Sequence, residues 1–439
     1  ATLRCLASLR FAIGVTMWRP MRCRDGGFVT IEVTAELRDR IRSAFPALAG
    51  DTVFLENAGG SQVPAAVADR VRDYMVSSYV QLGAGYELSQ RATDLVDEAH
   101  AFVKLLFNGS DGEVILGPST SALLQMLSNS YSKVLSPGDE VVVAEIGHEA
   151  NIGPWKGLAD SGIEIRWWEM DPSDFSSPLG ALEGVLSDRT ALVAFPHVSN
   201  LLGEILDVPA ITGLAHRAGA RVVVDGVAFA PHRVMDVAAW GVDYYAYSTY
   251  KVYGPHMAAM WASRDALAEL QGPNHFFIPD DELPYKFELG GVSHEGCAGI
   301  LGLRDYLELL AGVGEPGALD RSGVEHAFDV MTSCELPLQA RLVEYLRSRP
   351  DVRIIGPAHG GPSRVGTVSF VHDTKSSREI TEVVDGSGIA VRHGHMYAYH
   401  LCEALGMDPE DGVVRVSLVH YNTPDEIERL IGVFDRALG

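Results

Sequence analysis

The stretches Arg221-Val-Val-Val-Asp225-Gly226 and Ser248-Thr-Tyr-Lys251-Val-Tyr-Gly-Pro255 decide the fold of this chain. In both stretches, a chemically active side chain lies at or just after the carboxyl end of a predicted apolar strand. An Asp-Gly pair alone predicts a turn, and a single lysine is usually solvated. Together they favour an α/β sheet whose strand ends carry a ligand site. Because the aromatic residues Tyr250 and Tyr253 flank Lys251, we expect a desolvated, nucleophilic amine there.

Outward from these stretches, short β-branched runs alternate with longer helical patterns, which predicts an α/β fold with a mostly parallel sheet. Strands are predicted at 140–144, 191–195, 221–225 and 244–247, with helices at 121–134 and 208–218. Beyond Gly290 the pattern predicts helices at 302–310 and 323–347 and strands at 352–355, 367–371 and 413–419, a smaller α+β unit. We therefore expect an extension at 1–30, an N-terminal segment at 31–50 that packs on the small domain, a large domain at 51–315 and a small C-terminal domain at 316–439.

The composition disfavours several classes of function. The 439 residues include 35 Lys+Arg and 58 Asp+Glu, a formal charge of −23, which disfavours nucleic acid as a partner. No apolar run has the ~20 residues that a membrane span needs. The five cysteines form no CxxC pair, which favours a reducing cytoplasm over a disulfide framework. The arginine-rich stretch 1–27 is interpreted as an unstructured extension, with a targeting peptide as the alternative.

From about Thr52 to its end, the chain resembles the fold-type I pyridoxal-phosphate enzymes, and within them the class V aminotransferase and cysteine desulfurase family. Eight ordered blocks carry the resemblance: 54–60, 118–122, 147–155, 197–203, 224–226, 248–254, 388–392 and 415–422. The resemblance implies an aspartate-aminotransferase-like fold, with a mostly parallel seven-stranded sheet in the large domain and a smaller α+β C-terminal domain. It also implies pyridoxal 5'-phosphate as the cofactor.

The resemblance assigns roles around the cofactor ring. Lys251 would be the Schiff-base lysine and the acid/base that moves the α-proton, and Asp225 would keep the pyridine nitrogen protonated. His148 would lie flat over the ring, while Asn200 would donate a hydrogen bond to a ring substituent. Where relatives often carry glutamine or histidine beside the phenolic oxygen, this chain has Ala228.

Phosphate binding is expected at Ser119-Thr120-Ser121, where a helix begins and where backbone N–H groups and hydroxyls favour an anion. Further hydroxyls would come from Ser248 and Tyr250. The resemblance also implies a homodimer whose partner completes the phosphate site from the loop at 287–291. The hydroxyl residue of the family is Gly291 here, which leaves only a backbone contact.

Arg415 matches the arginine that binds an amino-acid α-carboxylate, and its planar guanidinium suits that role. Arg392, Asn57 and His395 are expected on the substrate side. The desulfurase branch has its cysteine nucleophile five residues beyond the equivalent of Arg392, and Tyr397 stands there in this chain.

Without that thiol, we expect cleavage of a C–S bond by β-elimination from an L-amino acid or cysteine S-conjugate. Lys251, Asp225, His148 and Tyr397 would be the catalytic residues. Four alternatives remain open: transamination, oxidative deamination or decarboxylation, desulfuration through Cys297 or Cys402, and a non-enzymatic binding protein. The stretch Leu82-Gly83-Ala-Gly85 predicts a wider substrate pocket than many desulfurases have. We expect no metal, although three histidines, His393, His395 and His400, would also be compatible with zinc.

Overall fold

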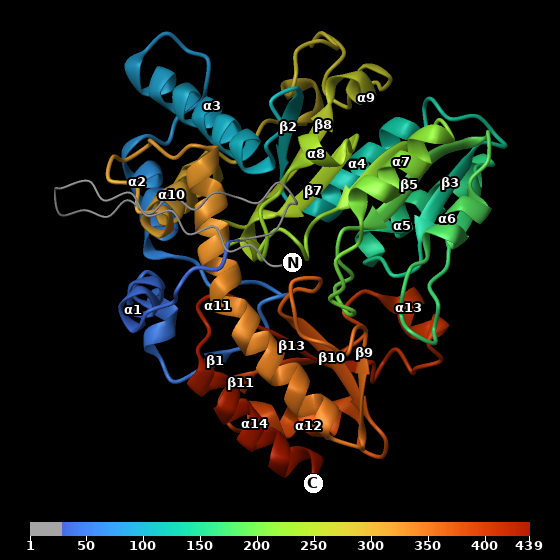
Figure 1. Cartoon of the computed structure of the whole chain (residues 1–439). Coiled ribbons are helices and arrows are strands. Elements are labelled where there is room, and N and C mark those ends of the chain that lie inside the picture. Colours follow the sequence, from blue (N-terminus) through green and yellow to red (C-terminus); the bar gives the residue numbers. More distant parts are fainter. Residues whose placement is uncertain (1–28) are drawn as a thin grey trace, which may run out of the picture.

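The structure is a computed structural model, and it describes residues 29–439 (Figure 1). The predicted extension at 1–30 lies almost entirely outside these residues. A seven-stranded sheet forms the larger part of the molecule, in the order β2-β8-β7-β6-β5-β3-β4. Its strands are β2 (Gly112–Gly117), β3 (Glu140–Ala144), β4 (Glu164–Trp168), β5 (Thr190–Pro196), β6 (Arg221–Asp225), β7 (Tyr244–Ser248) and β8 (Ala258–Ser263).

The sheet is parallel except at β8, which pairs antiparallel with both β2 and β7. Alternate residues of each strand enter two different cores, as expected for a sheet that is covered on both faces. One core joins the strands to α4 (Thr120–Tyr131) and α5 (Gly153–Lys156). The other joins them to α3 (Glu87–Phe107), α7 (Val208–Arg217) and α10 (His294–Ala311). The predicted fold class, with its mostly parallel seven-stranded sheet, is therefore confirmed.

A second sheet lies in the C-terminal part of the chain, drawn in orange and red in Figure 1. Its four strands are antiparallel in the order β12-β13-β10-β9. They comprise β9 (Val352–Ile355), β10 (Thr367–His372), β12 (Arg392–Gly394) and β13 (Val413–Ser417). Helices α12 (Ser377–Asp385) and α14 (Pro424–Leu438) pack on this sheet, together with the second half of α11 (Arg321–Ser348).

Segments near the start of the described chain connect the two parts. Helix α1 (Ala35–Ser43) reaches the C-terminal part through Arg42, whose Nη1 donates to the carbonyl of Tyr421 at 2.7 Å. Strand β1 (Val53–Phe54) pairs in parallel with β11 (Ile389–Ala390). The turn that follows β1 is thereby held beside β13, and this placement brings its side chains to the site described below.

The remaining helices are α2 (Ala65–Ser77), α6 (Leu179–Val185), α8 (Val237–Trp240), α9 (Arg264–Ala268) and α13 (Tyr399–Ala404). Short 3₁₀ turns lie at Pro46–Ala49, Glu149–Asn151, Gly157–Ser161, Thr249–Lys251 and Tyr285–Phe287. Between residues 29 and 439, no helix combines the length and the apolar character that crossing a bilayer requires.

Candidate active site

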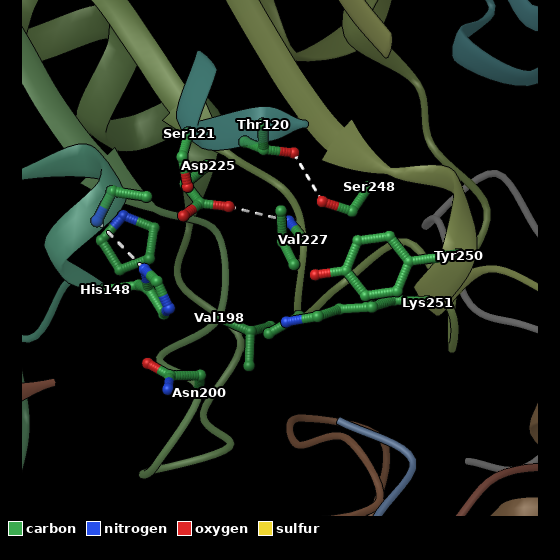
Figure 2. A pocket seen from close by; sticks show the side chains of 13 residues that line it. Thr120, Ser121, His148, Val198, Asn200, Asp225, Val227, Ser248, Tyr250 and Lys251 are labelled. Carbon is green, nitrogen blue, oxygen red and sulfur yellow. Dashed lines mark hydrogen bonds between the residues drawn. The ribbon is translucent and has the colours of Figure 1, made fainter. Parts of the chain in front are cut away.

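Four neighbouring parallel strands deliver the predicted cofactor residues to one edge of the large sheet. Asp225 ends β6, and Lys251 closes the 3₁₀ turn directly after β7. His148 follows β3 as the N-cap of a 3₁₀ turn, and Asn200 follows β5. Figure 2 shows all four side chains around one cavity. Its volume is about 470 Å³, and its lining consists of Thr120, Ser121, His148, Ala150, Pro196, Val198, Asn200, Asp225, Val227, Ala228, Ser248, Tyr250 and Lys251.

The Lys251 amine has the electrostatic setting of a nucleophile. Burial and the positive charge of Arg415 lower its pKa from 10.5 to about 8, although the carboxylates of Asp225 and Glu56 act in the opposite direction. Its Nζ lies 5.9 Å from the centre of the Tyr250 ring. A substantial fraction of Lys251 is therefore neutral near physiological pH, as attack on a carbonyl carbon requires.

Asp225 lines the cavity and is only 5% exposed. Its Oδ1 accepts a hydrogen bond from the Val227 backbone at 2.9 Å, and burial raises its pKa. A buried carboxylate with so little compensation is stabilised by a cationic donor. The protonated pyridine nitrogen of a bound cofactor would supply that donor.

The start of α4 offers groups that could bind an anion. The hydroxyls of Thr120 and Ser248 lie 2.8 Å apart at the N-terminus of this helix, where free N–H groups favour negative charge. Ser119 has a different role. Its Oγ accepts a hydrogen bond from the Ala122 backbone N–H at 3.1 Å and caps the helix, and Ser119 does not line the cavity. Ser121, one residue into α4, lines the cavity instead. The Tyr250 ring stacks on His256 with 4.2 Å between centroids, which fixes its plane.

His148 presents a neutral ring to the cavity. Its Nδ1 accepts a hydrogen bond from the Ala150 backbone at 3.0 Å, so the ring proton is placed on Nε2. Burial and the charge of Lys251 lower its pKa from 6.5 to about 4. The Tyr397 ring lies beside it, with 5.2 Å between centroids and an interplanar angle of 30°. A neutral, uncharged imidazole face suits stacking against an electron-poor ring.

Asn200 offers a different atom from the one expected. Its Nδ2 donates to the Met396 carbonyl at 2.8 Å, while its buried Oδ1 has no partner. The amide therefore presents an acceptor to a ligand, whereas the resemblance had implied a donor. An unpartnered buried acceptor is costly, and a ligand hydroxyl would satisfy it.

Two arginines of the second sheet were predicted on the substrate side, and neither belongs to the lining of this cavity. Arg415 is 3% exposed, and its Nη1 donates to the Asn200 carbonyl at 3.3 Å while its Nε has no partner. Arg392 lies opposite Arg415 on the neighbouring strand. Sequence reasoning missed the residue between them: an oxygen of Glu56 is 2.7 Å from Arg392 Nε and 3.8 Å from Arg415 Nη2. Only the fold brings Glu56 to these arginines, which are more than 300 residues away along the chain.

Other predicted residues lie outside the cavity lining. The side chain of Asn57 is buried and fully engaged, since it donates to Ser417 and Phe54 carbonyls at 2.8 and 3.0 Å and accepts from the Tyr421 hydroxyl. It therefore positions the turn after β1 and leaves no free group for a substrate. Gly291 is exposed, with φ of +81°, on a surface loop.

Tyr397 and His395 belong to a loop at the mouth of the cavity. Tyr397 is 64% exposed, and its backbone N–H donates to His395 Nδ1 at 3.0 Å. Both Met396 and Tyr397 have positive φ, a conformation that side chains rarely adopt and that is often found at functional sites. Over residues 29–439, no group of three or more His, Cys, Asp or Glu residues is arranged to hold a metal ion.

These features fit pyridoxal phosphate. The cavity combines an amine, a buried carboxylate that accepts a hydrogen bond from a neutral backbone N–H, a helix N-terminus and an unpartnered acceptor. The methyl group of Ala228 lines the same cavity and has no hydrogen-bonding atom.

Comparisons with known proteins bear on the family of this chain. The family model described as aminotransferase class-V matches residues 53–430. An aminotransferase-like protein of Gibberella zeae is 38% identical over 91% of this chain and 98% of its own length. A cysteine desulfurase of Serratia proteamaculans is 31% identical over 91% of this chain and 97% of its own length.

Among solved structures, a cysteine desulfurase from Thermococcus onnurineus NA1 superposes with a TM-score of 0.81. The superposition covers 93% of this chain and 99% of the desulfurase, at 24% identity. It therefore supports the fold alone. The family match over most of the chain and the two sequence relatives carry the assignment. The chain belongs to the class V aminotransferase family, which includes the cysteine desulfurases and whose cofactor is pyridoxal 5'-phosphate.

Proposed function

We propose that this protein acts on an L-amino acid or cysteine S-conjugate and cleaves its C–S bond by β-elimination. The observation that carries the proposal is the placement of Lys251 and Asp225 in one cavity, with Arg415 hydrogen-bonded to its lining and no reactive thiol beside them among residues 29–439. Cys297, Cys334 and Cys402 are free but buried, and burial raises the pKa of each thiol, to about 12 for Cys334 and about 11 for Cys402. None of these three cysteines is poised to supply the thiolate that desulfuration requires.

Lys251 would take the α-proton from the bound substrate. Its lowered pKa places proton uptake and release near neutral pH, where a general base is most effective. The bound cofactor supplies an electron sink for the charge that then develops on Cα. Asp225 would hold that sink in its protonated form through a buried charge-assisted hydrogen bond.

Arg415 would bind the substrate α-carboxylate, since its Nε is buried and unpartnered and its guanidinium borders the cavity residue Asn200. Cleavage of the Cβ–S bond leaves the electron pair on sulfur, which must be protonated. Tyr397, or a histidine of the same loop such as His395, would donate that proton at the mouth of the cavity. The organic product, 2-aminoacrylate, is then converted by water to pyruvate and ammonia, while the thiol departs.

Product analysis tests this proposal. The purified, cofactor-loaded protein is incubated separately with cysteine, with S-methylcysteine and with alanine, and the products of each reaction are quantified. We expect pyruvate and a thiol in equal amounts from S-methylcysteine. Alanine with sulfide would establish desulfuration instead, a pyridoxamine spectrum would establish transamination, and a keto acid or carbon dioxide with consumption of oxygen would establish oxidative chemistry.

A pair of lysine variants tests the catalytic assignment. Lys251→Ala should lower kcat by at least about 100-fold, the lower range for loss of a general acid/base. Lys133→Ala, which removes an exposed lysine after α4, should leave kcat unchanged. Turnover by Lys251→Ala at the rate of the unmodified protein would refute the role of this amine.

We also infer a homodimer with a shared active site. The support is a set of exposed apolar side chains on the loop that leads to Gly291, with Phe276, Phe277 and Leu289 exposed by 97%, 69% and 62%. Phe276 and Phe277 contact each other, and adjoining exposed apolar groups are typical of a surface that a partner covers.

A further inference from the structure

We call the place where Arg415 would bind the substrate carboxylate the carboxylate subsite. Its net charge depends on Glu56, a residue that has no role in the mechanism proposed above. Arg392 and Arg415 are directly opposed on neighbouring antiparallel strands, with their Cα atoms in register. Directly opposed residues project from the same face of a sheet, so two guanidinium groups share this subsite. Two cations together would attract a ligand with two carboxylates.

Glu56 changes that balance. Its Oε1 lies 2.7 Å from Arg392 Nε and 3.8 Å from Arg415 Nη2, and its side chain is only 24% exposed. The ion pair is therefore closer to Arg392, while Arg415 keeps an unpartnered Nε. One negative charge among two positive charges leaves a net charge of +1, which matches one carboxylate.

The position of Glu56 is built into the fold. The neighbouring backbone is fixed to β13 by hydrogen bonds from Asn57 N to the Ser417 carbonyl at 3.2 Å and from Ala58 N to Ser417 Oγ at 2.8 Å. The side chain folds over Gly59, where an added Cβ would lie 2.1 Å from Glu56 Oε1. The absence of a side chain at this glycine leaves the space that the carboxylate fills.

The same charges reach the reactive amine. Glu56 raises and Arg415 lowers the pKa of Lys251, which places both groups within electrostatic range of the reaction centre. A second carboxylate on the substrate would meet the negative charge of Glu56 in this small volume.

We propose that Glu56 is the specificity-determining residue of the subsite: it neutralises Arg392 and reserves Arg415 for a single carboxylate, so that monocarboxylic amino acids are selected over dicarboxylic ones. This inference rests on the proposed role of Arg415 in carboxylate binding. It deepens the proposed function by defining the charge of the substrate class.

The test measures binding of propionate and succinate to the cofactor-loaded protein by titration calorimetry, which requires no turnover. Glu56→Gln should raise the preference for succinate over propionate by about tenfold, as expected on removal of one partly buried charge. Gly59→Ala should change the preference in the same direction, because its methyl group displaces the carboxylate. Glu56→Asp retains the charge and should stay within about threefold of the unmodified protein.

Arg415→Gln separates this inference from the proposed function. If it leaves propionate binding unchanged, the carboxylate subsite lies elsewhere and that part of the proposed function fails. If it weakens propionate binding while Glu56→Gln leaves the succinate preference unchanged, only the role of Glu56 is overturned. An equal gain of succinate preference in Glu56→Asp and Glu56→Gln would also overturn the charge argument.

Discussion

Lys251 owes its reactivity to its position rather than to its residue type. An amine attacks an aldehyde only when it is unprotonated, and an ordinary lysine is almost fully protonated at pH 8. The strand that precedes Lys251 buries the amine, and Arg415 from the other sheet adds a second positive charge. The two effects lower the pKa to about 8, and they act only once both parts of the molecule have folded.

This pKa predicts how the cofactor-free protein takes up pyridoxal phosphate. Between pH 6.5 and 8 the uptake rate should rise steeply as Lys251 loses its proton, and above about pH 8 it should level off. Stopped-flow absorbance of the visible band measures the rate. Lys133→Ala serves as the control and should give the same profile. A rate that continues to rise to pH 10 would show that Lys251 titrates like an exposed lysine.

At the scale of single elements, two hydroxyl groups at the N-terminus of α4 have different roles, one in the proposed anion site and one in capping the helix. The sequence alone does not distinguish these roles. Thr120 is 4% exposed and contacts Ser248 beside the anion site, whereas Ser119 caps the helix. Thr120→Ala should weaken pyridoxal phosphate binding by about tenfold, the loss of a hydrogen bond to a charged group. It should leave binding of unphosphorylated pyridoxal nearly unchanged.

Ser119→Ala is the matched control for that element. Removal of an N-cap costs about 0.5–2 kcal/mol of stability, so this variant should unfold at lower urea concentration. Its ratio of pyridoxal phosphate to pyridoxal affinity should stay as in the unmodified protein. A selective loss of phosphate affinity in Ser119→Ala and not in Thr120→Ala would reverse the two assignments.

Element by element, the sequence predicted strands where β-branched residues signal them. Strands β3, β6 and β9 have the predicted bounds, and α11 begins and ends within two residues of its prediction. Strand β8 was missed because Ala258-Ala-Met-Trp-Ala-Ser263 lacks β-branched residues, so its pairing with β2 and β7 decides its conformation. Asp225 was predictable because it ends such a strand, whereas Lys251 follows the aromatic strand β7.

The substrate side was less predictable, because it depends on contacts between distant segments. No spacing in the sequence indicates that Glu56 meets Arg392 and Arg415. Asn57 is the opposite case, because the resemblance predicted that it contacts the substrate. In the structure its amide donates to backbone carbonyls instead and positions the turn after β1. Asp225 and Lys251 were therefore found from local pattern, whereas Glu56, which packing brings to the site, was not.

On the scale of the whole molecule, the site requires both sheets. Lys251 and Asp225 come from the large sheet, while Arg415 comes from the small one and donates to the carbonyl of Asn200. Ser369 of β10 adds a second link, since its Oγ donates to the Leu201 carbonyl at 2.7 Å. The segment after β5 is thus held by the small sheet, which fixes the distance between the amine and the carboxylate subsite.

The exposed loop beside Gly291 leads to a prediction about assembly. Phe276 and Phe277 contact each other edge to face at 5.5 Å, yet both remain largely exposed in the single chain. If a second copy covers them, Phe276→Ser combined with Phe277→Ser should convert a dimer to a monomer in light-scattering measurements. Because the partner loop is expected at the phosphate site, the same variant should also bind pyridoxal phosphate more weakly. Val383→Ser, an exposed apolar position on α12, is the control and should remain dimeric. A double variant that stays dimeric would place the interface elsewhere, and a monomer with unchanged phosphate affinity would show that each chain completes its own site.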